Sequence, residues 1–169
     1  MSQLKVDSIV PTAGVATGQG GGIIQTITES TNAILSTTST TSEEISSDLR
    51  ATIVPKNANN IIIIRLSIGV ISTTSNNVAT IRILKNGTDF VEAPLDTAEG
   101  QGNGQVWTGN ENMIPMSITV KELAGNTNSR YYSPFFRTNS STVHINSYRI
   151  APAFRTTTNI TVMEVSGWI

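Results

Sequence analysis

The chain has 169 residues, a net charge of -1 and no cysteine, so disulfides and thiolate metal sites are excluded. Its length allows one domain of ordinary size, or one domain with an appendage. Lys and Arg are scattered singly, which excludes an electrostatic surface for nucleic acid. The longest apolar run, Ile61–Ile64, is far shorter than a membrane span, and no apolar signal segment precedes it. We therefore expect no membrane insertion and no export by the general pathway.

The surface chemistry is unusual. Charged residues make up 14% of the chain, whereas about 25% is typical, and Ser, Thr and Asn together fill about a third of the positions. Thr fits well on a pleated strand. This composition favours a β-sheet surface that contacts other subunits or neutral polar ligands such as glycans.

Residues 1–22 predict a short strand followed by a glycine-rich tether. Apolar and polar residues alternate at its start, Pro11 ends the run, and five glycines follow between Gly14 and Gly22. A strand without a sheet of its own is suited to docking on the sheet edge of another protein. The alternative is a frayed or self-docked terminus. The docking residues of this N-terminal arm would be Leu4, Val6, Ile9 and Val10.

Residues 23–169 predict one all-β domain, since apolar residues alternate with period two between turn residues. One helical turn is expected within residues 43–49. Strand spacing of about ten residues indicates an antiparallel β-sandwich, jelly-roll-like or otherwise, with the N-terminal arm extended from it. The predicted strands are Ile23–Thr28, Ala33–Leu35, Arg50–Val54, Asn60–Thr73, Val78–Leu84, Thr88–Val91, Met113–Leu123, Tyr131–Arg137, Ser141–Ile150 and Arg155–Val165.

Two of these regions carry particular information. The strand Asn60–Thr73 places Ile62, Ile64, Leu66, Ile68 and Val70 on one face, which predicts the core face. Its start is apolar on both faces, so we expect that end to be covered twice, by the core and by another element or subunit.

A tight hairpin turn is predicted at Lys85-Asn86-Gly87, because an Asn-Gly pair tolerates positive φ angles. After this hairpin comes a long polar, glycine-containing segment, Pro94–Asn112. Loops of that length in compact domains are usually functional or disordered.

The catalytic inventory is nearly empty, so we expect no enzyme, no cofactor and no metal site. His144 is the only histidine and alternates with two apolar residues on a predicted strand. Glu43 and Glu44 are adjacent and point in different directions. Glu164 lies within an apolar strand, which is typical of a rim residue or a partner for an arginine. A glycan-active enzyme or a free glycan-binding protein, using Trp107 and the acids near it, is therefore the remotest alternative.

Aromatic residues supply the candidate contact site. Trp107 stands in the glycine-containing segment beside Asn110, and Tyr131 and Tyr132 begin an aromatic strand. An exposed aromatic ring with neighbouring amides grips a neutral sugar by stacking and hydrogen bonds. The alternative is that these residues fill a contact between subunits.

Several short motifs resemble segments of virion structural proteins of tailed phages, especially those of marine and cyanobacterial hosts. Residues 4–9 (LKVDSI) with the following glycine tether resemble the attachment segments of such proteins. Residues 51–56 (ATIVPK), 83–88 (ILKNGT) and 160–165 (ITVMEV) look like elements of their β-rich head domains.

The resemblance implies a tail fibre or short fibre-like appendage in the virion, assembled in the host cytoplasm. Its N-terminal arm would bind another virion protein, either a tail adaptor or baseplate protein or the capsid protein. Its β domain would form a homotrimer for host attachment, with a host surface glycan as a further expected partner. The body is small and has no repeat-built shaft, which leaves a capsid decoration protein as the alternative. The family has no shared catalytic residues to carry over.

Overall fold

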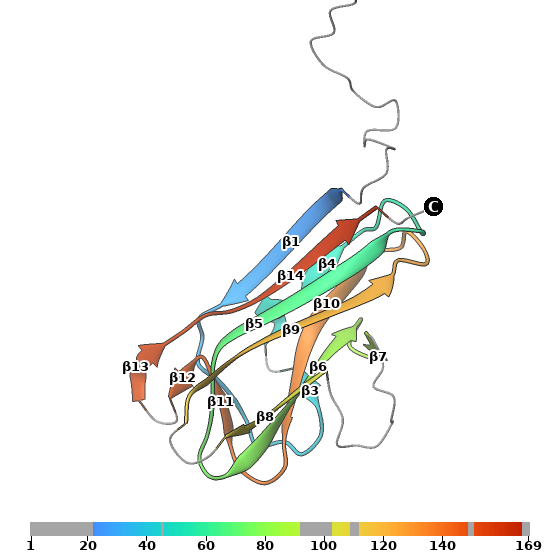
Figure 1. Cartoon of the computed structure of the whole chain (residues 1–169). Helices are drawn as coiled ribbons and strands as arrows, with labels where there is room; N and C mark the ends of the chain where they lie inside the picture. The colour runs from blue at the N-terminus through green and yellow to red at the C-terminus, as the bar shows by residue number, and fades with distance from the viewer. Residues whose placement is uncertain (1–21, 45, 92–102, 109–111, 149–150, 167–169) are drawn as a thin grey trace, which may run out of the picture.

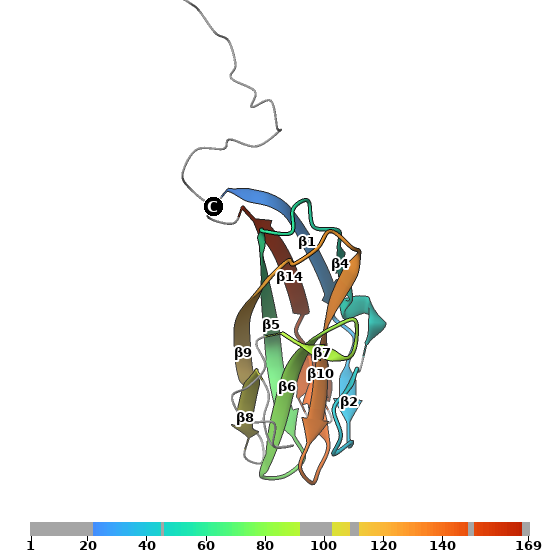
Figure 2. The ribbon, with the colours of Figure 1, turned by 90° about the vertical axis from the view of Figure 1, so that its right-hand side faces the viewer.

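The computed structural model describes residues 22–44, 46–91, 103–108, 112–148 and 151–166. In these residues the chain forms two packed antiparallel sheets, and the prediction of an all-β sandwich is confirmed. Figure 2 views the sandwich from its side, with β9 and β5 in one layer and β6 and β10 in the other. Residues 1–21 of the N-terminal arm, which include the four predicted docking residues, lie outside the described residues.

The first sheet is organised around β5 (Ile61–Thr73). One edge of β5 pairs with β14 and then, beyond Ile68, with β11, while the other edge pairs with β9. β1 adds to the outside of β14, and β2 to the outside of β11. These partners are β1 (Ile23–Thr31), β14 (Thr158–Val165), β9 (Ile114–Leu123), β11 (Val143–Ile145) and β2 (Leu35–Thr37).

The second sheet is organised around a central pair, β10 (Arg130–Thr138) and β6 (Asn77–Lys85). The short strands β3 (Glu43–Glu44) and β4 (Ala51–Ile53) share the free edge of β10. Likewise β7 (Asp89–Phe90) and β8 (Gly104–Thr108) share the free edge of β6. β12 (Ser147–Tyr148) and β13 (Ala151–Arg155) form a separate two-stranded sheet.

The core lies between the sheets and contains the predicted face of β5. Ile62, Ile64, Leu66 and Ile68 are all buried, whereas Arg65 on the opposite face is exposed. The prediction is wrong at Val70, which is half-buried: the pairing of β5 with β9 shifts register between Ile68 and Ile71, and Ile71 is buried instead. Side chains from η1, from the far end of β5 and from the other strands complete the core. The largest of these fully buried side chains are Tyr132, Phe136, Leu49, Ile53, Ile71, Ile81, Ile83 and Ile145.

The hairpin turn is confirmed: Asn86 and Gly87 have φ angles of 54° and 77°. Several predicted boundaries differ from the structure. The predicted strand Ser141–Ile150 breaks at Asn146, which has a φ of 65° that a strand cannot accommodate. Asn146 holds this conformation by donating hydrogen bonds to the carbonyls of Thr31 and Ala33 and by accepting one from the Thr158 hydroxyl.

The segment 43–49 also differs in detail from the expected helical turn. Glu43 and Glu44 pair with β10 as β3, and a 3-10 turn, η1 (Ser47–Leu49), follows them. Ser46 begins this turn by accepting a hydrogen bond from the Asp48 N–H. The second predicted strand moves to β2, since the hydroxyl-rich residues after Leu35 pair with β11.

Glu164 fastens the loop before β5 to the first sheet. It faces the core from β14 and is fully buried. Its Oε1 accepts hydrogen bonds from the Lys56 N–H (2.7 Å), the Asn57 N–H (3.3 Å) and the Asn60 Nδ2 (2.5 Å), and its Oε2 accepts one from the Gln25 Nε2 (2.5 Å). Burial alone would raise the pKa of Glu164, but these donors hold the pKa below the ordinary glutamate value.

We predict that Glu164→Gln lowers the free energy of unfolding by about 2–3 kcal/mol at neutral pH, because an amide NH₂ would replace one of the two accepting oxygens in a buried site. The lowered pKa means that the carboxylate adds stability above the ordinary glutamate pKa of about 4.3, and that this stability is lost as pH falls through the folded-state pKa. Urea unfolding at several pH values measures both effects.

The matched control is Glu29→Gln, which makes the same chemical change on β1. We expect it to retain most of the stability of the parent chain and to keep the parent's acid dependence. Equal acid dependence in the parent and in Glu164→Gln would contradict the assignment of this effect to Glu164.

Candidate functional site

The two ends of the sandwich differ in what they carry. The described part of the chain begins and ends at one of them, where the Ser166 N–H donates to the Gly22 carbonyl at 3.1 Å. We call this the terminal end (Figure 1). β5 runs from the terminal end for 13 residues, or roughly 40 Å, to the opposite end, where β6 begins. The terminal end therefore holds the junction with the arm, and the opposite end, the distal end, lies farthest from it.

Trp107 lies toward the distal end, on the outer face of the second sheet. It pairs with Val78 near the start of β6 and is 66% exposed, while its neighbour Val106 packs on the core. The exposed Gln105 precedes it on the same face. A flat indole beside an amide side chain offers the stacking surface and the hydrogen bonds that a neutral sugar ring requires.

Local packing explains why this segment is a strand rather than the predicted loop. Asn103 accepts a hydrogen bond from the Ile83 N–H at 2.6 Å and donates to the Val91 carbonyl at 2.9 Å, which fixes the start of β8. At Gly104 an added Cβ would lie 2.7 Å from the Ile118 Cδ1, so a larger residue would require the Ile118 and Met116 side chains to shift, and glycine allows β8 to approach the first sheet closely. The segment 94–112 is therefore partly strand, and Asn110 lies outside the described residues.

Tyr131 lies at the terminal end, on β10. Its half-buried ring carries the Arg50 guanidinium at 5.0 Å from the ring centroid. Arg50 also donates from Nε and Nη2 to both carboxylate oxygens of Glu44, and this hydrogen bonding lowers the pKa of Glu44. Arg50 thus pairs with Glu44 and lies over the Tyr131 ring, so Tyr131 is part of a surface ion-pair cluster.

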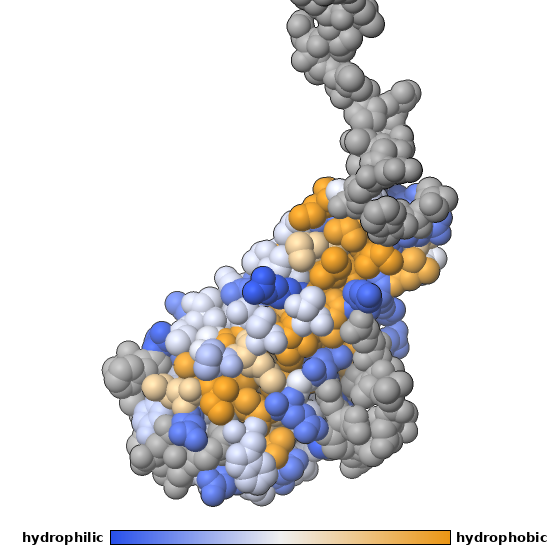
Figure 3. Space-filling view, viewed as in Figure 1, coloured by the Kyte–Doolittle hydropathy of each residue, from blue (hydrophilic) through white to orange (hydrophobic). Residues whose placement is uncertain are grey.

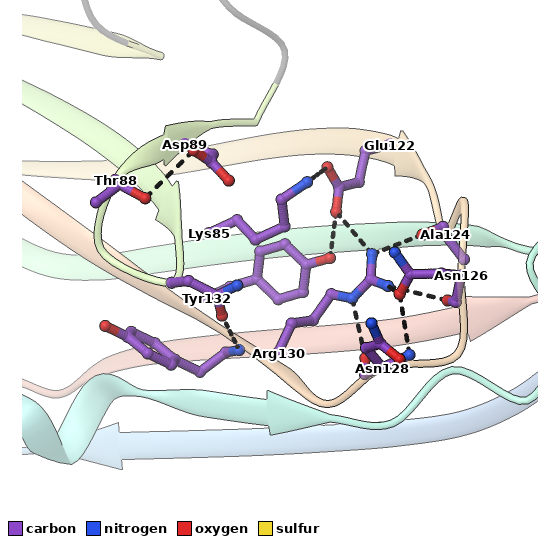
Figure 4. Close-up of polar contacts among 11 residues, drawn as sticks. Lys85, Thr88, Asp89, Glu122, Ala124, Asn126, Asn128, Arg130 and Tyr132 are labelled. Carbon is purple, nitrogen blue, oxygen red and sulfur yellow. Dashed lines mark hydrogen bonds and ion pairs between the residues drawn. The ribbon is translucent and has the colours of Figure 1, made fainter.

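Tyr132 is a core residue, so its position does not suit the predicted surface contact with a ligand or subunit. It is fully buried, and its hydroxyl donates to the Glu122 Oε1 at 2.5 Å. The Glu122 Oε2 accepts from the Lys85 Nζ at 2.9 Å, and the Arg130 Nη1 lies 3.6 Å from Oε1 (Figure 4). Burial is the main cause that raises the pKa of the Tyr132 hydroxyl.

This four-residue cluster joins the two sheets. Glu122 comes from β9 of the first sheet, whereas Lys85, Arg130 and Tyr132 come from the second. Arg130 also donates to the Ala124 carbonyl at 2.6 Å and to the Asn126 carbonyl at 2.9 Å, which closes the turn between β9 and β10. The cluster has the donors and acceptors of a structural tie, and each member is held by a neighbour within the fold.

The predicted contact residues do not form one site. Tyr132 pairs with Lys85, and Trp107 pairs with Val78, so the two lie seven residues apart along β6, or roughly 23 Å. Sequence reasoning also missed the cluster around Glu122, because its members are far apart in the chain and no local motif connects them. Of the predicted contact residues that the structure describes, Trp107 has the most exposed ring.

His144 and the acidic side chains are the remaining candidates for catalysis or metal binding. His144 is half-buried on β11, where it pairs with Ser36 and Ser72 of the flanking strands. Within the described ranges no group of three or more His, Asp or Glu side chains is placed to hold a metal ion. In the same ranges there is no helix long and apolar enough to cross a bilayer.

Comparison with known proteins gives no assignment: no protein-family model matches the chain, and a search of curated proteins finds no match. The fold defines the class of the protein as an all-β sandwich.

We predict that Tyr132→Phe lowers the free energy of unfolding by about 1–2 kcal/mol, since it removes the hydroxyl that Glu122 accepts from inside the core. Tyr131→Phe, which removes a hydroxyl at the neighbouring position on the outer face, should change the stability by less than about 0.5 kcal/mol. Urea unfolding followed by circular dichroism gives both values. Equal losses in the two variants would contradict the structural role of the cluster.

Proposed function

We propose that this chain is a structural protein of a tailed-phage virion, a tail fibre or short fibre-like appendage. In this proposal the arm of residues 1–22 fixes the protein to another virion protein, a tail adaptor, baseplate or capsid protein. The β domain is a homotrimer displayed for host attachment. The observation that carries the proposal is the separation of the two ends: the arm joins the body at the terminal end, and the exposed Trp107 lies toward the distal end.

The body supports this division because its sheets are complete without the arm. Every strand from β1 to β14 finds its partner among residues 23–165. The described sheets therefore form without residues 1–21, and the proposal assigns the strand expected in that segment to docking on another protein. The low charge of the whole chain suits a protein that is surrounded by other subunits.

The proposed ligand on the distal side is a neutral host surface glycan. Trp107 and Gln105 provide an aromatic platform and an amide on one exposed face. Neutral hydrogen-bonding groups recognise sugar hydroxyls without requiring charge on the ligand.

A capsid decoration protein is the second candidate. It is favoured by the size of the body, a single sandwich roughly 40 Å long with no shaft in the described residues. Locating the chain on native particles by cryo-electron microscopy separates the two functions. Dozens to hundreds of copies on the capsid would replace the fibre assignment with the decoration assignment.

We predict that deletion of residues 1–22 leaves a folded β domain that no longer joins the particle. The deletion removes no strand of the two described sheets, so circular dichroism and cooperative urea unfolding should be retained. Mass spectrometry of purified particles measures incorporation.

A Val6→Asp variant provides the matched test, because it keeps the length of the arm and places a charge among its apolar residues. We expect it to fold and to be poorly incorporated. Loss of folding on deletion of residues 1–22 would show that the arm belongs to the body.

We predict that Trp107→Ala reduces binding to host polysaccharide by about tenfold and slows particle adsorption, while the stability of the fold stays unchanged. Met113→Ala removes another exposed apolar side chain and serves as the control. Isothermal titration calorimetry with purified polysaccharide measures the affinity. Undiminished binding by Trp107→Ala would remove Trp107 from the attachment surface.

A further inference from the structure

The outer face of the first sheet carries an apolar patch at the terminal end. Four neighbouring strands each present an apolar residue in the same cross-strand row, and the next row adds two more. Figure 3 shows this patch beside the first described strand. The outer apolar patch consists of Ile23, Val165, Ile61 and Leu123 in the first row and Met163 and Ile63 in the second.

These residues face away from the core, as the alternation along their strands shows. Ile62, Ile64, Val162 and Glu164 are buried between the sheets, and the residues alternating with them point outward. Ile23 is 62% exposed and Leu123 is 58% exposed. An antiparallel sheet with one face in water normally carries polar residues on that face, so this apolar group indicates a covered surface.

The patch is confined to one end. The third row reads Thr28, Thr161, Arg65 and Thr119, and the fourth row reads Ser30, Asn159, Ser67 and Ser117. Thr28 and Thr161 join their hydroxyls at 3.0 Å. A hydroxyl both donates and accepts hydrogen bonds, so rows of this kind can pair with a surface of the same composition.

Charge is distributed unevenly across this face. The four rows contain two cations, Arg65 on β5 and Lys121 on β9, and no carboxylate. Carboxylates lie off this face, at the β1 edge: Glu29 alternates with the outward-facing Thr28 and Ser30 and so points to the other side of β1, and Asp48 lies in η1, which contacts β1. A rotational arrangement that sets the β5–β9 side of one copy against the β1 edge of the next therefore brings cations toward an edge that carries carboxylates.

The dimensions suit a contact between copies. Four strands and four rows cover roughly 20 Å by 26 Å before side-chain relief is counted. A standard stable interface takes about 800 Å² of accessible surface from each partner. The pleated face with its side chains exposes more area than its flat outline, so it approaches that size with the apolar patch at one end.

We propose that the outer apolar patch, together with the hydroxyl-rich rows next to it, is the surface on which copies of this chain associate. The proposal rests on the homotrimer of the proposed function and names the face that holds it together. Because the patch lies at the terminal end, association there would bring the arms of all copies to the same side. Clustered arms bind a particle with far greater avidity than one arm alone.

The test uses the full chain and two substitutions that place a charge in the patch, Leu123→Glu in its first row and Met163→Glu in its second. The control is Met113→Glu, because Met113 is 48% exposed and lies just before β9, outside the patch. Leu123→Met serves as the conservative variant. Size-exclusion chromatography with light scattering measures the mass, and circular dichroism verifies that each variant is folded.

We expect the parent chain, Met113→Glu and Leu123→Met to have three times the monomer mass of 18.0 kDa. Leu123→Glu and Met163→Glu should show a threefold lower mass with an unchanged fold. Folded patch variants that keep the parent's mass would overturn the proposal. So would a parent chain that is monomeric from about 1 to 100 µM, which would indicate cover by the arm or by another virion protein.

A second measurement separates this proposal from the proposed function. Leu123→Cys introduces a thiol into a chain that has none, and Met113→Cys is its control. In the assembled protein, labelling by a maleimide should be slowed at position 123 and not at position 113. Slow labelling with absence of the parent chain from purified particles would keep the interface and reject the virion function; fast labelling at both positions in the assembled protein would reject the interface.

Discussion

The hydrogen bonding of β5 along both of its edges is the constraint on which the first sheet depends. β14 and β11 occupy one edge and β9 the other, so the position of every strand in that sheet follows from the register of β5. A shift by one residue would exchange its two faces. At Ile61–Ile64 such a shift costs little hydrophobic burial, since both faces are apolar there. Arg65 and Ser67 oppose it, because both would enter the core unpaired.

The hydrogen bonds of Glu164 also hold this register. Its partner on β5 is Ile62, and its carboxylate accepts hydrogen bonds from the loop that leads into β5. A one-residue shift of β14 would place this carboxylate outside and break those hydrogen bonds. A buried charge is costly by itself, yet a fully hydrogen-bonded one discriminates strongly between alternative pairings. At the apolar end of the sheet, the hydrogen bonds of Glu164 thus distinguish the native register from a shifted one. The apolar residues on the outer face are not needed to set that register.

The sequence predicted the local features well, because strands and tight turns depend on neighbouring residues. The alternation in β5 and the Asn86-Gly87 turn are both read within a few positions. It failed where distant residues decide the outcome. Asn146 interrupts a predicted strand, because its side chain forms hydrogen bonds with Thr31, Ala33 and Thr158. Tyr132 lies in the core, where its hydroxyl donates to Glu122 of the other sheet. Contacts of this kind join residues that are far apart in the sequence, so no spacing of residues in a local motif predicts them. The arm and Asn110 stay predictions, since they lie outside the described residues.

The few charged residues are divided between the interior of the fold and its outer faces. Part of the small charged inventory is used inside the fold, at Glu164 and around Glu122, where burial gives each interaction its strength. The outer face of the first sheet then relies on hydroxyls and on two cations. Hydroxyl-rich strands remain soluble without fixing a charge pattern, so they tolerate both water and a copy of themselves. An isolated apolar row beside them would promote indiscriminate pairing, whereas Arg65 and Lys121 restrict which surface can approach it. In the association that we propose, the apolar end would supply the free energy and the two cations would orient the approaching surface.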